Sequence, residues 1–333
     1  MGRPGTEPTK LLLSVDTEED NWKPARTGIT VENVREIPRL QQFCERLGLR
    51  PTYFVNYQVM AQRWAADVFG GIHRSGRAEV GGHVHPWNTP PCEDGGDRFG
   101  TMLCSYPADM QDALIRIVTE HIGSATGSAP TSFRAGRFGL NQMTVGFLAG
   151  LGYRVDSSVT PYFSWGGRGG GVGGQDFTNA PLGIYRIDES APVTQSVAGG
   201  ALIEVPISSG FTRLGPRSWR HLASLRRRDD LPSRAVLSVA NRFGRVRRVL
   251  LSPEVATLSD MLALARGLVR ERVSHVHLFF HGTSMRPGLT PFTRTAADVD
   301  RLLGRVEGFV EGLTALTSVK PMTVTEAALA SAV

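Results

Sequence analysis

Short apolar segments alternate along the chain with longer segments in which apolar residues recur at helical spacing. Residues 10–17 and 50–57 are predicted strands because they are apolar, β-branched or aromatic. Residues 31–48 lie between them, show helical spacing and end at Gly48, a residue that often terminates helices. Strand, helix and strand in succession favour parallel pairing through crossover helices. Repeated over this length, the pattern predicts a single α/β barrel.

The remaining segments continue the alternation. Further helices are predicted at 108–123, 141–152, 258–273 and 295–316, further strands at 131–136, 153–158, 183–190, 201–209 and 275–284, and a short element at 322–328. We expect residues 1–9 to form a disordered tail and residues 10–333 a single domain. The glycine-rich stretch 164–175 is predicted to be a mobile loop or lid, because so many glycines hold regular structure only at a cost.

Composition excludes several classes of protein. Hydrophobic residues make up 41% and charged residues 20% of the chain, as in an ordinary globular enzyme. No window approaches 18 consecutive apolar residues, and the polar opening has no apolar core of a signal peptide. Cys44, Cys92 and Cys104 are odd in number and lack C-x-x-C spacing, so we expect no disulfide framework and no zinc knuckle. A cytoplasmic location is expected, with the inner face of the membrane as an alternative.

The net charge of +6 is concentrated in one segment, residues 211–248. This segment holds eleven arginines and two aspartates, a net charge of +9, which leaves −3 on the rest of the chain. It is predicted to be helical, and solvated helix faces with paired charges are one interpretation. The alternative is a surface that binds a phosphate-bearing substrate, lipid- or nucleotide-linked, or an anionic membrane. Nucleic acid is not expected, because no recognition module accompanies the charge.

Two histidines in the stretch EVGGHVHPWNTPP, residues 79–91, are spaced for a shared site. In extended chain, residues two apart point to the same face, so His83 and His85 can direct two imidazoles at one point. The prolines at 86, 90 and 91 prevent the segment from continuing as a helix or central strand. A solvated loop is the alternative interpretation of this stretch taken alone.

Other polar residues also follow predicted strands. Asp16, His83, Arg134, Asp156 and His281 each lie at the C-terminal end of an apolar segment. In α/β barrels the chemistry gathers at these strand ends. The sequence therefore predicts that the five residues converge on one site.

Five segments occur in a fixed order: SVDTEED, GGHVHPWN, SFRAGRFG, GYRVDSSVTP and HLFFHGTS. Their order and spacing resemble the five motifs of the polysaccharide deacetylase family, which is the NodB-homology group or carbohydrate esterase family 4. The resemblance covers roughly residues 10–330 and looks closest to bacterial proteins of surface-polysaccharide gene clusters. It implies a (β/α)7-type distorted TIM-like barrel. It also implies metal-dependent hydrolysis of an N-acyl group, acetyl or formyl, on a sugar or glycoconjugate.

The resemblance implies one divalent metal ion, zinc first, with cobalt or nickel as alternatives. Two imidazoles and a carboxylate with open positions suit such a catalytic metal. His83 and His85 would be the imidazoles. Glu18 is the expected carboxylate ligand, because it shares the face of the strand end, and Glu19 and Asp20 compete with it.

The family motifs assign further roles. Asp16 would be the general base, Arg134 would hold its carboxylate, and His281 would protonate the leaving amine. Asp156 would orient the catalytic histidine. Arg137 is close enough in sequence to exchange roles with Arg134.

Trp87 and Asn88 follow the histidines and could contact a sugar, although a packed tryptophan is an equal alternative. The family usually spaces its two histidines four apart, whereas here position 87 is tryptophan and His85 substitutes from another place. This departure suggests a substrate other than chitin or peptidoglycan polymers. Two other functions stay open: hydrolysis of a cyclic amide or ureide on the same fold, and a catalytically degraded glycan- or phosphate-binding protein.

Overall fold

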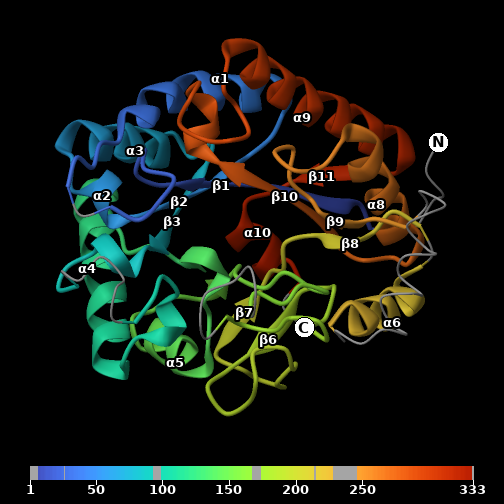
Figure 1. Cartoon of the computed structure of the whole chain (residues 1–333), viewed down its shortest axis with the longest axis horizontal. Coiled ribbons are helices and arrows are strands. Elements are labelled where there is room, and N and C mark those ends of the chain that lie inside the picture. Colours follow the sequence, from blue (N-terminus) through green and yellow to red (C-terminus); the bar gives the residue numbers. More distant parts are fainter. Residues whose placement is uncertain are drawn as a thin grey trace.

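A curled sheet of parallel strands forms the centre of the molecule, with helices around its outer face (Figure 1). The computed structural model describes residues 7–25, 27–92, 99–166, 174–213, 215–227 and 246–331. Seven parallel strands run in the order β10-β1-β2-β3-β4-β5-β7. Their bounds are Thr9–Thr17 (β1), Thr52–Val55 (β2), Glu79–Val84 (β3), Ser132–Ala135 (β4), Val155–Asp156 (β5), Leu202–Glu204 (β7) and His275–His281 (β10).

Four more strands extend or flank this sheet. They are β6 (Tyr185–Ile187), antiparallel to β7, β11 (Val319–Pro321), parallel to the start of β1, and the separate antiparallel pair β8 (Ser209–Phe211) and β9 (Arg248–Leu250). No ladder joins β7 directly to β10. Instead, the amide of Ser208 donates to the carbonyl oxygen of His277 at 3.2 Å, and the amide of Phe279 donates to that of Leu251 at 3.1 Å. The barrel therefore closes through irregular chain.

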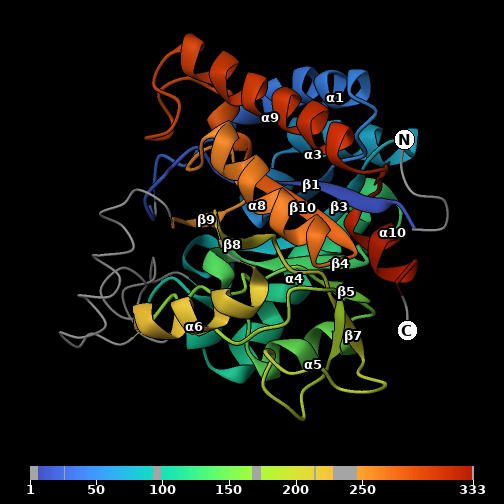
Figure 2. The same cartoon turned by 90° about the vertical axis from the view of Figure 1, so that its right-hand side faces the viewer.

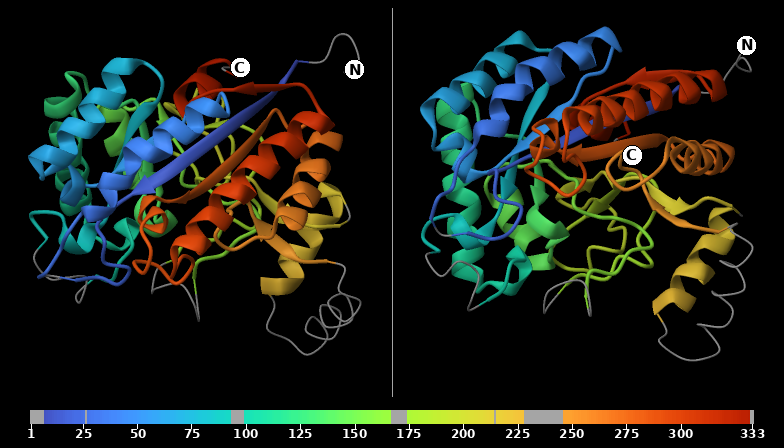
Figure 3. Two further views of the ribbon diagram at one scale, coloured as in Figure 1. Left: turned by 90° about the horizontal axis from the view of Figure 1, so that it is seen from above. Right: turned by 45° about the horizontal axis from the view of Figure 1, so that its top comes forward.

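The helices cover the outside of the barrel, and α9 lies along β1 and β10 (Figure 3). Their bounds are Ile37–Arg46 (α1), Tyr57–Met60 (α2), Arg63–Ser75 (α3), Ala108–Thr126 (α4), Gln142–Gly150 (α5), Pro216–Arg227 (α6), Leu258–Arg270 (α8), Ala296–Leu316 (α9) and Val324–Leu329 (α10). Among the described helices, none is long and apolar enough to cross a bilayer.

Strand β1 shows how the two faces of the sheet differ. Leu11, Leu13 and Val15 belong to the large apolar cluster shared with the outer helices. Leu12 belongs to a second cluster, with residues of β2, β5 and β7 and with side chains of α10. Asp16 shares the inner face with Leu12, because side chains alternate along a strand. Helix α10 thus closes the end of the barrel where β1 begins, opposite the strand ends (Figure 2).

The predicted α/β barrel of the (β/α)7 type is confirmed. The helix predicted over 31–48 is divided: a 3-10 helix covers Glu32–Glu36 and α1 begins at Ile37, with a proline in its first turn. Proline lacks an amide donor and fixes its own φ, so it suits a helix start and not a helix interior. Most of the glycine-rich stretch (167–173) and half of the arginine-rich segment (214 and 228–245) lie outside the described residues.

Candidate active site

The strand ends bring the predicted residues to one edge of the barrel. In the β1–β10 pairing, Asp16 lies directly opposite His281, although 265 positions separate them in the chain. In the β3–β4 pairing, His83 lies opposite Arg134. Parallel strands place all their carboxyl ends on one edge of the sheet. Here that edge carries the carboxylate of Asp16, the guanidinium of Arg134 and the imidazoles of His83 and His281.

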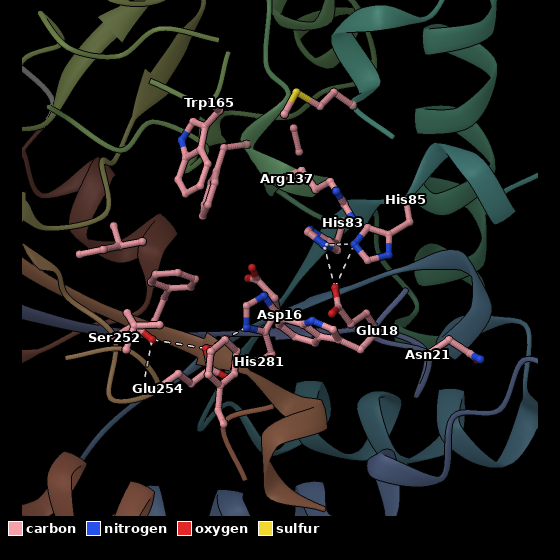
Figure 4. Close-up of a pocket in the computed structure, with 18 of the residues that line it drawn as sticks. Asp16, Glu18, Asn21, His83, His85, Arg137, Trp165, Ser252, Glu254 and His281 are labelled. Carbon is pink, nitrogen blue, oxygen red and sulfur yellow. Dashed lines mark hydrogen bonds and ion pairs between the residues drawn. The ribbon is translucent and has the colours of Figure 1, made fainter. Parts of the chain in front are cut away.

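Glu18, His83 and His85 form a compact group of three buried side chains (Figure 4). The Nε2 atoms of the two histidines are 3.1 Å apart. Oε2 of Glu18 lies 2.9 Å from Nε2 of His85 and 3.7 Å from Nε2 of His83. Ligands of a tetrahedral zinc ion, each at about 2.1 Å from the metal, lie roughly 3.4 Å apart. The spacing of the three atoms therefore suits a divalent metal.

The hydrogen bonds of the histidines agree with this. Nδ1 of His83 faces the carbonyl oxygen of Arg134 at 2.9 Å, and Nδ1 of His85 faces the carboxylate of Glu19 at 3.2 Å. Both partners are acceptors, so each Nδ1 carries a proton, and Nε2 of each imidazole is directed toward that of the other. A cation shared by the two Nε2 atoms would satisfy this contact. It could be a metal ion, or a proton on His85, because burial lowers the pKa of His85 but the carboxylates of Glu19 and Glu18 outweigh this and raise it to about 10. Metal-binding histidines commonly use their second nitrogen in this way.

Among the acids 18–20, Glu18 alone has a carboxylate directed at both histidines. Burial disfavours its ionised form, but His85 and His83 outweigh this and hold the pKa of Glu18 well below the usual range. The carboxylate of Glu19 accepts hydrogen bonds from the amides of Asn56 and Asn88 and supports His85. That of Asp20 is taken by four hydrogen bonds from residues 30–33, at 2.6–2.9 Å. The geometry thus favours Glu18 as a ligand.

Arg134 is fully buried and contacts the carboxylate of Asp16. Its Nη1 lies 2.6 Å from Oδ1 of Asp16, and its Nε donates to the carbonyl oxygen of Ser157 at 2.8 Å. The guanidinium also lies over the ring of Phe54, 4.4 Å from the centroid. A buried guanidinium with fixed partners orients the carboxylate of Asp16. Arg137 does not share this position, so the two arginines do not exchange roles.

His281 pairs with Glu254, a residue that the sequence analysis does not assign. Nδ1 of His281 lies 2.9 Å from Oε2 of Glu254, and the amide of His281 donates to Oε1 of Glu254 at 3.2 Å. Burial alone would lower the pKa of His281, but Glu254, with further contributions from Glu18 and Asp16, raises it to about 10. Glu254 follows the end of β9 by four residues, but the sequence analysis predicts no strand there, so only the short apolar run 249–251 could have drawn attention to it.

Asp156 does not have the position predicted for it. Its carboxylate accepts hydrogen bonds from the amide and the hydroxyl of Ser158, at 2.7 and 2.9 Å. Glu204 of β7 lies opposite it in the sheet. Asp156 is fully buried and is not among the residues that line the cavity. In the described residues the carboxylate that contacts the ring of His281 is that of Glu254.

The predicted sugar contacts are only partly retained. Trp87 lines the cavity but is 4% exposed, because its ring stacks on the imidazole of His85 with centroids 4.1 Å apart. Asn88 is 9% exposed, and its amide donates to Glu19 at 2.7 Å. Asn88 therefore supports the histidine site and does not face the cavity, a correction to its predicted role. Trp87 and Asn88 are both buried because Trp87 packs on the ring of His85 and Asn88 bonds to Glu19, which contacts that ring.

A cavity of about 400 Å³ opens in front of these residues. Its walls combine the polar group just described with aromatic side chains that the sequence analysis did not single out, apart from Trp87. The aromatic residues are Trp22, Trp87, Phe138, Trp165, Phe279 and Phe292. Trp22 packs edge-on against His281, 5.3 Å between centroids, and is 38% exposed at the mouth of the cavity. Such rings can contact the apolar face of a sugar or an acyl group.

No protein family model and no curated protein matches the sequence. Among solved structures, a "putative glycoside hydrolase/deacetylase" from Parabacteroides distasonis aligns with a TM-score of 0.57 at 12% identity, over 97% of this chain and 71% of that one. A 4-alpha-glucanotransferase from Thermococcus litoralis aligns with a TM-score of 0.54 at 11% identity, over 98% of this chain and 40% of that one.

A third solved structure, a "putative polysaccharide deacetylase" from Mycobacterium smegmatis, has a TM-score of 0.48 at 15% identity, over 97% of this chain and 96% of that one. The chain therefore has the barrel fold expected from its resemblance to polysaccharide deacetylases. At these identities the likeness defines the fold. Function depends on the residues of the site and not on the fold alone.

Proposed function

We propose that the protein is a metal-dependent hydrolase that removes an N-acyl group, acetyl in the first instance, from an amino sugar or glycoconjugate. The observation that carries the proposal is the arrangement around one cavity of a Glu–His–His group, an Asp–Arg pair and a Glu–His pair. Amide hydrolysis needs these parts: an activated water, stabilisation of the oxyanion, and a proton for the leaving amine.

The donor set fits a divalent metal, and Glu18, His83 and His85 would hold it. When bound, such an ion lowers the pKa of water and polarises a carbonyl group. Two nitrogens and one oxygen, with a position left open, favour zinc, with cobalt or nickel as alternatives.

The other residues of the cavity would manage two protons. Asp16, oriented by Arg134, accepts the proton that the attacking water loses. His281, charged through its pair with Glu254, donates its proton to the nitrogen of the leaving amine. The carbon–nitrogen bond then breaks to give a carboxylic acid and an amine.

Metal content tests the proposal most directly. We expect about one divalent ion per chain in the wild type and loss of the ion and of activity in His85→Ala, because one of the three ligands is removed. His121→Ala is the matched control, since His121 is a half-buried histidine outside the cavity. Elemental analysis and hydrolysis of acetamido sugars are the measurements. Full activity after chelation of all metal would overturn the scheme.

A further inference from the structure

The turn that follows β4 holds Arg137 in a strained backbone conformation. Arg137 and Phe138 are successive non-glycine residues with φ of 52° and 58°, in the left-handed region. Each such residue costs about 1–2 kcal/mol, and this kind of strain concentrates at functional sites. A Cβ on Gly136 would lie 2.6 Å from Cδ2 of His85, so the turn packs directly against that histidine.

The strained turn places the side chain of Arg137 in the cavity wall, beside His83 and His85 (Figure 4). Its guanidinium lies over the ring of Trp87, 5.4 Å from the centroid. In the described parts of the chain, no carboxylate lies within ion-pair distance of Arg137. Burial lowers the pKa of Arg137, opposed by the more distant Glu18. An arginine directed at a cavity without a counter-ion is suited to bind an anion.

The charges around the cavity lead to the same conclusion. Asp16 is balanced by Arg134, and His281 is balanced by Glu254. The carboxylates of Glu18 and Glu19 would balance a divalent ion. Among the described residues that line the cavity, Arg137 then remains as one uncompensated positive charge. A ligand that carries one negative charge would complete the balance.

We infer that the substrate carries an anionic group, a carboxylate or a phosphate, close to its N-acyl group, and that Arg137 binds this group. The inference rests on the proposed function and narrows its substrate class from acylated amino sugars in general to acidic ones. The planar guanidinium forms paired hydrogen bonds with either kind of oxyanion. Arg137 is thus a specificity-determining residue.

Ligand binding to the metal-loaded protein tests this independently of turnover. The probes are N-acetylglucosamine, its 1-phosphate, its 6-phosphate and the corresponding N-acetylated uronic acid. Calorimetry and tryptophan fluorescence report binding, since Trp22, Trp87 and Trp165 line the cavity. We expect at least one anionic probe to bind roughly tenfold or more tightly than the neutral sugar. The phosphate and carboxylate probes distinguish the two sources of charge.

Two variants and a control assign the effect. Arg137→Gln should abolish the preference for the anionic probe and change binding of the neutral sugar by less than about twofold, and Arg137→Lys should keep part of the preference. Arg46→Gln removes an exposed guanidinium that lies over the ring of Phe43, outside the cavity, and should keep the whole preference. Circular dichroism checks that each variant is folded.

Each outcome decides one claim. Equal binding of neutral and anionic probes by the wild type, or a preference that survives in Arg137→Gln, overturns the inference. A loss of kcat on the neutral sugar in Arg137→Gln, without a change in charge preference, also overturns it and assigns Arg137 to the developing oxyanion. Hydrolysis of neutral sugars with no charge preference leaves the proposed function intact. If the wild-type protein binds anions through Arg137 but takes up no metal, the proposed metal-dependent hydrolysis is rejected and the role of Arg137 in anion binding stands.

Discussion

His281 is held as a charged imidazolium by the carboxylates around it, and Glu254 is the nearest of these. A group that donates a proton must still carry it at the working pH. With a pKa of about 10, His281 keeps its proton through the neutral range and loses it in the alkaline range. The alkaline limb of the activity profile should therefore report on this one residue.

Glu254→Gln is expected to move that limb to lower pH by about one unit or more, because the amide removes the negative charge that raises the pKa of His281. The measurement is kcat/KM as a function of pH for the wild type and the variant. Ser284→Ala is the matched control, since it removes the hydroxyl that donates to Glu254 but leaves the charge in place. An unchanged alkaline limb in Glu254→Gln would show that another group titrates there.

The free energy of unfolding should also depend on pH through the ion pair of His281 and Glu254. The pKa of His281 in the folded protein lies above its unfolded value of about 6.5. The stabilisation from the pair is therefore complete below about pH 6.5 and is lost as pH rises toward about 10. Urea unfolding of Glu254→Gln should show a weaker decline across this window than the wild type.

Several individual site residues could be predicted, because a polar residue after an apolar run marks a strand end. This held for the placement of Asp16, His83 and His281 at one edge of the barrel. It failed for Asp156 and Asn88, whose side chains bond within their own surroundings. Whether such a side chain faces the cavity depends on the hydrogen-bond partners around it, some of them from elements far apart in the chain, which local sequence does not encode.

At the scale of the element, two helices end with the same backbone geometry but different residues. After α5, the amide of Gly152 donates to Ala149 at 3.1 Å, and after α8, that of Arg272 donates to Val269 at 3.0 Å. Their φ values are 87° and 56°, both left-handed. Glycine adopts this conformation freely, whereas arginine does so at a cost.

Arg272→Gly is therefore expected to raise the free energy of unfolding by about 0.5–1 kcal/mol, after the extra entropy of the unfolded glycine is deducted. Arg272 is exposed and lies outside the cavity, so activity should not change. The matched substitution Gly152→Ala should lower stability by about 1 kcal/mol, since a Cβ there meets no atom within 4 Å and only the backbone conformation is strained. Thermal unfolding measures both. Equal effects of the two substitutions would contradict the argument.

The long helices and the buried strands were the most predictable elements. Helix α9 follows its predicted range of 295–316 to within one residue, because its apolar spacing is continuous and Thr295 caps its first turn. The segments 183–190 and 201–209 were predicted only as strand material, and they divide into β6, β7 and β8. Short strands depend on their neighbours for pairing, so their bounds are set by the sheet.

At the scale of the whole molecule, α10 closes one end of the barrel. Val324, Ala327 and Ala328 of this helix pack against Leu12 and Phe54 from the inner face of the sheet. This cluster lies at the end opposite the cavity. The helix thus buries the inner face of strands whose other ends carry the proposed catalytic residues, and its packing contributes to the stability of the barrel.

Val324→Ala is expected to lower the free energy of unfolding by about 2 kcal/mol, because it removes two fully buried methyl groups. Leu329→Ala on the same helix removes more atoms but should cost less than about 0.5 kcal/mol, since Leu329 is 39% exposed. Denaturant unfolding measures the two differences. A larger loss in Leu329→Ala would mean that α10 does not close the barrel in this way.

The fold class, the order of the elements and the strand ends at which chemistry was expected could all be predicted from the amino-acid sequence. These follow from periodicity and from residue type, which act over a few neighbouring positions. Three features could be seen in the folded chain alone: Glu254 pairs with His281, Glu18 and not Asp20 faces the histidines, and Arg137 lines the cavity. Each of these depends on strand register and barrel closure, which bring together residues far apart in the chain.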